Sequence, residues 1–260
     1  MGDPAAAAGW GIAVGLSLLA GAGVAALVRL PERTAAVLTA FGGGVLLAAI
    51  ALELVPAADD GAGTWLTAAG LLAGTLVYVG ADAWLTRDAH MKMMRRAGHA
   101  AAAGRPMDMP AASGEEGRGE AGRGESIAVG IFVDGVPESV ALGLTIAEGE
   151  LGVALLAGIL LGNVVESYGA AQPIIAEGHS RRFALVLLGA IGVALAAATA
   201  LGGTVLADAS AALIGTAEAF AAGAVMAVVS IAIIPYAFSA VSSRVASATV
   251  LGFIAGYLLG

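Results

Sequence analysis

The chain has 260 residues, of which 59% are hydrophobic and only 12% are charged, and its net charge is −8. Soluble globular proteins carry about 25% charged residues, so this composition excludes an ordinary soluble domain and indicates a polytopic membrane protein. The chain contains no cysteine, which excludes disulfides and thiolate metal sites.

Eight apolar segments follow one another, each close to the roughly 20 residues that a helix needs to cross the hydrocarbon core. We therefore expect an all-α membrane protein with eight transmembrane helices in one polytopic domain over residues 1–260. The last segment is the shortest of them. The segments cover approximately 6–28, 35–57, 64–86, 127–147, 151–176, 183–206, 211–235 and 245–260.

The basic residues are confined to alternate connections. All 12 follow the first, third, fifth or seventh segment, whereas the N-terminus and the other connections carry acids and no base. By the positive-inside rule the basic connections are cytoplasmic, which predicts a plasma-membrane protein with both termini outside. The first segment has an acid before it and arginines after it, so we expect a retained helix and no secretory signal. The basic residues are Arg29, Arg33, Arg87, Lys92, Arg95, Arg96, Arg105, Arg118, Arg123, Arg181, Arg182 and Arg244.

One connection is long. Residues 88–126 are rich in Ala, Gly, Arg and Glu without apolar periodicity, which predicts a disordered cytoplasmic loop. His90 and His99 lie in it, and two interpretations stay open: a loop that gathers metal ions, or a plain basic segment beside the membrane.

Two apolar segments resemble each other. Residues 41–56 and 220–235 share Phe, Gly, Ala and Pro at equivalent positions without a gap. This similarity predicts a transporter with repeated halves, arranged as three, two and three helices, with its site between the halves. The alternative is that Gly- and Ala-rich helices look alike by chance. The matched pairs are Phe41 with Phe220, Gly44 with Gly223, Ala48 with Ala227 and Pro56 with Pro235.

Five acids fall inside the predicted spans, and no Lys or Arg does. Acids at membrane depth are expensive and indicate function. Without a base to pair with, they either carry protons or hold a cation, and a cluster of them favours the cation. The five are Glu53, Asp82, Asp134, Glu138 and Glu166.

Four polar residues form two helical pairs. Asp134 and Glu138 are one turn apart in the fourth segment, and Asn163 and Glu166 are just under one turn apart in the fifth, so each pair shares a helix face. Each helix also contains a proline, which leaves a carbonyl without its helical donor, as is tolerated where a helix lines a polar cavity. Together the four residues predict an oxygen-rich site for a divalent cation.

The other polar residues have less specific roles. For Glu53, two interpretations stay open: a further metal ligand, or an interfacial acid near the outer surface. We expect Asp82 to be a solvated residue at a cytoplasmic helix end and Glu218 to be interfacial. Ser139 and Ser167 each follow a glutamate, and we expect them to orient it.

The motifs read DGVPES over residues 134–139 and GNVVES over residues 162–167. With the repeated Phe–Pro frames, they resemble the ZIP family (zinc/iron-regulated transporter-like permeases), whose fourth and fifth helices carry HNxPEG-like motifs. The resemblance implies eight helices, outside termini, a long cytoplasmic loop after the third helix, an elevator-like movement and a homodimer. It also places Asp134, Glu138, Asn163 and Glu166 at binding positions.

The chain departs from the family pattern. Asp134 stands where the family has a histidine, Gly135 where it has an asparagine, and Gly162 where the fifth helix has its own donor. The helix-seven acids of the family are also missing, although Glu53 could compensate for them from the other half. We therefore expect one site with oxygen ligands instead of two metals.

These observations predict a secondary transporter of divalent metal ions, with the ion as substrate and no resident cofactor. Zinc is the family default, whereas carboxylate ligands shift the preference toward Mn, Fe(II), Co or Mg. Two alternatives stay open: a metal-sensing or metal-binding relative that has lost transport, and a proton-coupled carrier of an organic solute. We expect no enzyme, because no nucleophile–base set is recognisable. The expected partners are the cation and the lipid bilayer, and no nucleic acid.

Overall fold

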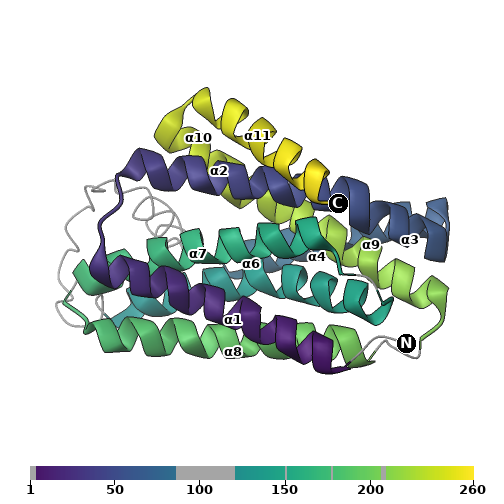
Figure 1. Ribbon diagram of the computed structural model, residues 1–260, viewed down its shortest axis with the longest axis horizontal. Helices are drawn as coiled ribbons and strands as arrows, with labels where there is room; N and C mark the ends of the chain where they lie inside the picture. The colour runs from purple at the N-terminus through teal and green to yellow at the C-terminus, as the bar shows by residue number, and fades with distance from the viewer. Residues whose placement is uncertain (1–3, 86–120, 150, 177, 206–208) are drawn as a thin grey trace.

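The computed structural model describes residues 4–85, 121–149, 151–176, 178–205 and 209–260 (Figure 1), and these ranges contain helices and no strand. Two of the helical segments, η1 and η2, are π-helical. In chain order the elements are α1 (Pro4–Leu27), α2 (Glu32–Ala49), η1 (Ile50–Leu54), α3 (Val55–Ala62), α4 (Thr64–Leu85), α6 (Ala121–Ala147), α7 (Val153–Ala176), α8 (Arg181–Val205), α9 (Ala211–Val228), η2 (Val229–Ile233), α10 (Ile234–Val241) and α11 (Arg244–Leu259).

The described residues form seven helical spans that are long and apolar enough to cross a membrane. They correspond to the first seven predicted segments. The eighth, α11, is a shorter apolar helix. The chain is therefore an all-α, multi-pass membrane protein.

The predicted loop over 88–126 falls largely outside the described residues, which omit 86–120. Its last part is a correction: α6 begins at Ala121, ahead of the predicted start at 127. Apolar content marks the stretch of a helix that lies in lipid, whereas backbone hydrogen bonding continues beyond it.

Two helices run beyond the ends of their predicted segments, which were residues 57 and 235. The helix of α2, η1 and α3 continues through Pro56 to Ala62, and that of α9, η2 and α10 continues through Pro235 to Val241. In a helix, a proline ring collides with the carbonyl group one turn earlier. For Pro56 this is the carbonyl of Leu52, and for Pro235 it is that of Ile231. Both carbonyls lie inside a π-helical turn, where hydrogen bonds reach one residue further and leave room for the ring.

The helices pack in recurring pairs. α1 lies beside α8 and α7, α6 beside α8, α2 beside α11, and α4 beside α9 (Figure 1). Small residues allow the close approaches that membrane helices use. A Cβ added to Gly15 of α1 would lie 2.8 Å from the carbonyl oxygen of Gly192 in α8, and the converse distance is also 2.8 Å. These glycines fix the α1–α8 crossing.

The α2–α11 and α4–α9 crossings are built alike. In each, two glycines lie against a backbone carbonyl of the partner helix so closely that an added Cβ would collide with it. The glycine-to-carbonyl contacts are Gly44 to Thr249 and Gly252 to Phe41 in the first crossing, and Gly223 to Leu71 and Gly74 to Phe220 in the second. Phe41 and Gly44 are the residues that match Phe220 and Gly223 in sequence.

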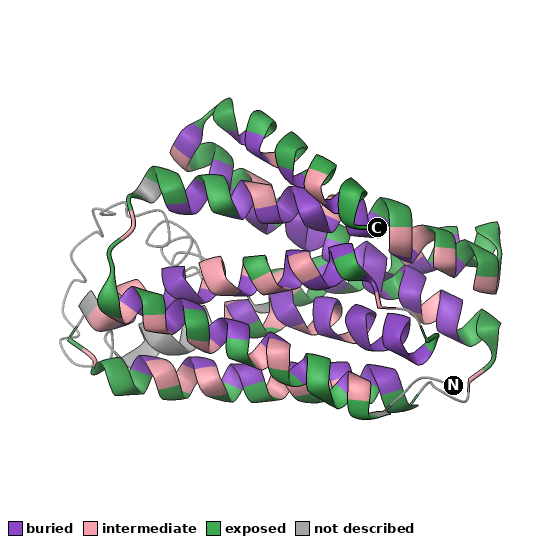
Figure 2. Cartoon of the chain, in the orientation of Figure 1, coloured by how far each residue is buried: buried purple, intermediate pink, exposed green. Residues whose placement is uncertain are grey.

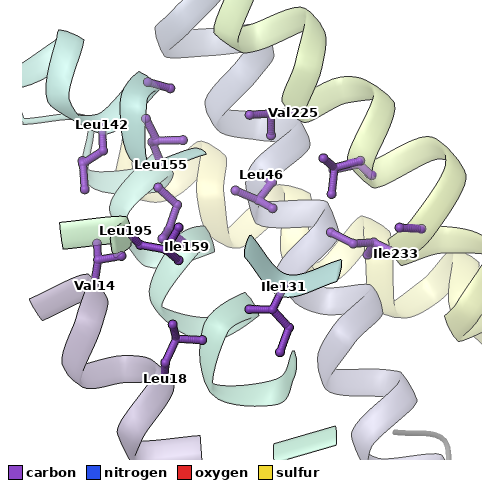
Figure 3. Close-up of a cluster of buried hydrophobic side chains, with 14 of the residues drawn as sticks. Val14, Leu18, Leu46, Ile131, Leu142, Leu155, Ile159, Leu195, Val225 and Ile233 are labelled. Atoms are coloured by element: carbon purple, nitrogen blue, oxygen red, sulfur yellow. The ribbon is translucent and has the colours of Figure 1, made fainter. Parts of the chain in front are cut away.

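The core lies between α1, α2, α6, α7, α8 and α9, where buried residues face one another (Figure 2). By contrast α4 exposes large apolar side chains, such as Trp65 at 88% and Leu72 at 61%, as a lipid-facing helix does. Figure 3 shows part of the core; the residues labelled there are Val14, Leu18, Leu46, Ile131, Leu142, Leu155, Ile159, Leu195, Val225 and Ile233.

The two ends of the bundle differ in charge. We call one the arginine end, where Arg29, Arg33, Arg181, Arg182 and Arg244 lie at or near helix termini. At the opposite, acidic end, α3 and α6 finish and α4, α7 and α9 begin, and its described charges are Asp59, Asp60 and Glu148.

Candidate functional site

The centre of the candidate site is a pair of buried acids on α6. Asp134 and Glu138 are 4% and 5% exposed and one helical turn apart, so they share a face. Pro137 lies between them inside the helix and leaves the carbonyl of Val133 without its usual donor. This part of α6 therefore brings two carboxylates and a backbone acceptor together, as the sequence predicts.

A tyrosine from another helix reaches this pair. The hydroxyl of Tyr78 on α4 donates a hydrogen bond to Oδ1 of Asp134, and the tyrosine is 3% exposed. Sequence reasoning missed Tyr78. Its signal is that it lies one turn before Asp82, so α4 carries two polar groups on one face of an otherwise apolar stretch.

Helix α7 carries the other predicted ligands at matching depths. α6 ends at Ala147 and α7 begins at Val153. The number of residues from Asp134 to Ala147 equals the number from Val153 to Glu166. The rise of an α-helix therefore places both at the same distance, about 20 Å, from the acidic end of their helices.

The side chains of α7 do not all point to that site. Asn163 is buried, and its Nδ2 donates to the carbonyl oxygen of Val14 on α1 at 3.4 Å. Glu166 is half-buried. Within the described residues, no three or more His, Asp or Glu side chains lie close enough together to hold a metal ion. The structure therefore brings the α6 pair together and does not assemble the predicted four-residue cage.

Glu53 makes a contact that neither interpretation of it included. From η1, its Oε1 accepts the N–H of Ala154 and its Oε2 accepts that of Leu155, both at 3.1 Å. These are amides of the first turn of α7, which have no partner within their own helix. The side chain therefore caps α7 from a neighbouring helix, a contact that no local pattern encodes.

The opposite end of α7 binds α1 and the connection that follows it. Gln172 Nε2 donates to the carbonyl oxygen of Ala25 at 2.8 Å, and the N–H of Leu30 donates to the Tyr168 hydroxyl at 2.6 Å. Between these ends, a Cβ on Gly21 of α1 would collide with Ser167 Oγ. α1 and α7 thus form a tightly joined pair.

The two glycines in the motifs have opposite surroundings. A Cβ on Gly135 would lie 2.6 Å from Cδ1 of Leu195, a fully buried side chain of α8. A Cβ on Gly162 would meet nothing within 4 Å. Leucine therefore fills the space beside position 135, whereas space is open beside position 162, one turn before Glu166.

The two serines do not orient the glutamates in the way expected. Ser167 Oγ donates to the carbonyl oxygen of Asn163 at 2.6 Å, in its own helix. Ser139 is fully buried, and its Oγ has no hydrogen-bond partner among the described residues. A hydroxyl one residue after an acid points about 100° away from it around a helix, which explains the difference.

Two further acids complete the description. Asp82 is half-buried near the end of α4. Glu218, expected at the interface, is 0% exposed in α9. The expectation was wrong because α9 begins at Ala211, so Glu218 lies two turns inside a helix that packs against α3, α4 and α6.

The fold and this site define a class: a multi-pass, all-α membrane protein with buried acids at mid-depth. In comparisons with known proteins, no protein-family model and no curated protein matches the chain.

Proposed function

We propose that the chain is a secondary transporter of divalent metal ions that binds its ion at Asp134 and Glu138. The observation that carries the proposal is this buried pair, about 20 Å and about 14 Å from the end of α6. Two adjacent carboxylates in a low-dielectric interior repel each other, and a divalent cation relieves that repulsion. The basic residues of the described ranges lie at helix ends or in connections, away from the pair.

Asn163 and Glu166 complete the ligand set in this proposal when α7 moves against α6. The matching depths of Glu166 and Asp134 support this step. Oxygen ligands suit hard cations, so the candidate ions are Mn, Fe(II), Co and Mg, with Zn as the default of the ZIP family that the motifs resemble. Leu195 beside Gly135 supports one site instead of two, because it fills the space beside the missing asparagine.

Duplicated halves would give such a protein its alternating access. Three features support an arrangement of three, two and three helices. The Phe–Pro frames match in sequence, and the two glycine crossings are built alike. The π-helical turns, Ile50–Leu54 and Val229–Ile233, also lie at equivalent positions of the two frames. The π-helical turns at equivalent positions thus extend the similarity from sequence to backbone. The site lies on α6 and α7, which follow the first three helices and precede the last three.

The charge asymmetry supports an orientation. With the arginine end in the cytoplasm, the acidic end and both termini face outward across the plasma membrane. The acidic end then presents Asp59 and Asp60 to incoming cations. By resemblance to the ZIP family, the protein is a homodimer that moves ions inward.

One observation favours a second candidate. Because no three acids are grouped in the described residues, Asp134 and Glu138 can instead serve as proton carriers that drive an organic solute. A proton carrier needs single titrating groups and no cage. A metal-binding relative without transport is the third candidate, and it predicts binding without flux.

Uptake into liposomes separates the three. Purified protein is reconstituted with a metal-sensitive dye inside, and Mn²⁺ and Zn²⁺ entry is compared for wild type, Glu138→Gln and the exposed control Glu148→Gln. We expect metal entry that Glu138→Gln abolishes and Glu148→Gln preserves. Metal binding without entry supports the sensing relative. Absence of both binding and entry, with a pH-dependent proton flux, overturns the metal proposal.

A further inference from the structure

The contact between Glu53 and α7 joins two parts of the molecule. Glu53 lies in η1, within the long helix that ends at Ala62, whereas Ala154 and Leu155 open the helix that carries Asn163 and Glu166. Both carboxylate oxygens are engaged, each by one backbone amide. Charge-assisted bonds of this kind are about twice as strong as neutral ones, and the positive end of the helix dipole adds to them.

The helix that Glu53 holds is already joined to α1. Asn163, Tyr168 and Gln172 all form hydrogen bonds with α1 or the residues just after it. A movement of α7 therefore carries α1 along, and it must break the Glu53 bonds at the acidic end. Neighbouring groups pack closely there, since a Cβ on Gly152 would lie 2.9 Å from Glu53 Oε2.

The second π-helical turn, η2, has no carboxylate at the position equivalent to Glu53. The residue that is equivalent to Glu53 when the two Phe–Pro frames are aligned is Ala232, which has no polar side chain. A carboxylate cap is thus present at η1 and absent at the equivalent position of η2. A difference of this kind biases a protein with two access states toward the state in which the capped end is closed.

We propose that Glu53 is a positioning residue that latches α7 to the α2–η1–α3 helix and keeps the acidic end closed. Release of the two amides lets α7, with α1, move away and opens a path from the acidic end to the α6 acids. This inference rests on the proposed transport function for its purpose, whereas the latch itself is a property of the fold and is testable without transport.

The chain is suited to a thiol-accessibility test because it contains no cysteine. One reporter is Ile159→Cys, at a position that is 1% exposed on the acidic side of α7. The other is Ala171→Cys, at a position that is 0% exposed toward the arginine end. Each is labelled with a charged maleimide in lipid nanodiscs, alone and combined with Glu53→Gln. The control is Glu148→Gln, which removes an exposed acid from the same end.

We expect Glu53→Gln to raise the labelling rate of Ile159→Cys about tenfold, because the loss of one charge-assisted bond shifts a two-state equilibrium by about one power of ten. Ala171→Cys should be unchanged, as should both reporters with Glu148→Gln. An unchanged rate at Ile159→Cys overturns the latch. So does an equal rise at both reporters, which indicates general loosening.

A second variant removes the donor instead of the acceptor. Ala154→Pro deletes one of the two N–H groups at a first-turn position where proline is tolerated. We expect Ala154→Pro to raise the labelling rate of Ile159→Cys when residue 53 is the native glutamate. When Glu53→Gln is also present, Ala154→Pro should add little. Full additivity of the two changes contradicts a shared contact.

The failure of the latch and the failure of the transport proposal give different results. Binding of Mn²⁺ to the same nanodiscs is measured in parallel. If Mn²⁺ binds and Glu53→Gln leaves labelling unchanged, the latch alone is wrong. If no metal binds and Glu53→Gln still raises labelling of Ile159→Cys, the latch stands and the transport proposal is wrong.

Discussion

Helices α6 and α7 carry the same kinds of polar residue at the same depth, yet they use them differently. On α6, Asp134 and Glu138 are both buried, and the Tyr78 hydroxyl donates a hydrogen bond to Asp134. On α7, Asn163 bonds to α1, Glu166 is half-buried, and the first turn is capped by Glu53. The two acids of α6 thus lie together in the interior, whereas most of the polar groups on α7 bond to neighbouring helices.

In the proposed transport function, this difference makes α6 the binding element and α7 the movable one. A binding element needs acids that are already desolvated and close together, which α6 provides. A movable element needs a few discrete contacts at its ends that form or break as units, which α7 provides.

Substitution of the acids should separate the two helices. We expect Glu138→Gln to weaken Mn²⁺ binding about a hundredfold or more, because it removes one of two adjacent carboxylates, and Glu166→Gln to weaken it only about tenfold. Equilibrium binding to purified protein measures both. Equal losses from the two substitutions would show that Glu166 contributes as much to binding as Glu138, so that α6 is not the main binding helix.

The α1–α7 contact should depend on one glycine. Gly21→Leu forces a side chain against Ser167 and Val164, so we expect the folded state to lose about 2–3 kcal/mol. Gly23→Leu on the same helix meets open space and serves as the control. Thermal unfolding in detergent measures the change. A midpoint equal to that of the control would show that α1 and α7 are not a joined pair.

A donor placed on α7 should make the two helices more alike. Because a Cβ at Gly162 meets nothing within 4 Å, Gly162→His adds an imidazole one turn before Glu166. We expect Zn²⁺ affinity to rise about tenfold relative to Mn²⁺, since imidazole favours zinc. Gly9→His, at another open glycine far from the site, is the control, and calorimetric titration is the measurement. An unchanged Zn²⁺ preference would show that position 162 does not face the ion.

The smallest effect is expected from the tyrosine. Tyr78→Phe removes only the hydroxyl that bonds to Asp134, so the carboxylate loses its orientation while packing is kept. We expect a roughly threefold to tenfold weaker affinity for Mn²⁺, the lower range for a residue that orients a ligand. The exposed Tyr257→Phe on α11 is the control. If the two phenylalanine variants bind Mn²⁺ equally, Tyr78 has no part in the site.

The features of the site that could be predicted from the sequence are those that lie within one helix. The pairing of Asp134 with Glu138 follows from helical periodicity, and the structure places both in the interior. The contact from Tyr78 was missed because it joins α4 to α6, and sequence spacing says nothing about which helices become neighbours. The contact of Glu53 with two amides of α7 was missed for the same reason, because it depends on α7 beginning directly beside η1.

The fold, too, has features that could be predicted from the sequence and features that could not. Lengths of apolar sequence are enough to predict seven of the spans, because burying backbone in lipid requires helices of a set length. The continuation of two helices past Pro56 and Pro235 was not predictable from those prolines, which ordinarily end a helix. It depends on the π-helical turns that precede them.

Sequence patterns alone predict that the chain is a membrane protein of apolar helices, that the arginines of the described residues lie at one end, and that α6 carries two acids on one face. These properties depend on composition and on periodicity within one segment. Only the tertiary structure decided that Glu53 caps α7, that Leu195 fills the space beside Gly135, and that Asn163 faces α1. The physical reason is that a helix fixes the spacing of its own side chains, whereas its rotation and its neighbours are set by packing against the rest of the bundle.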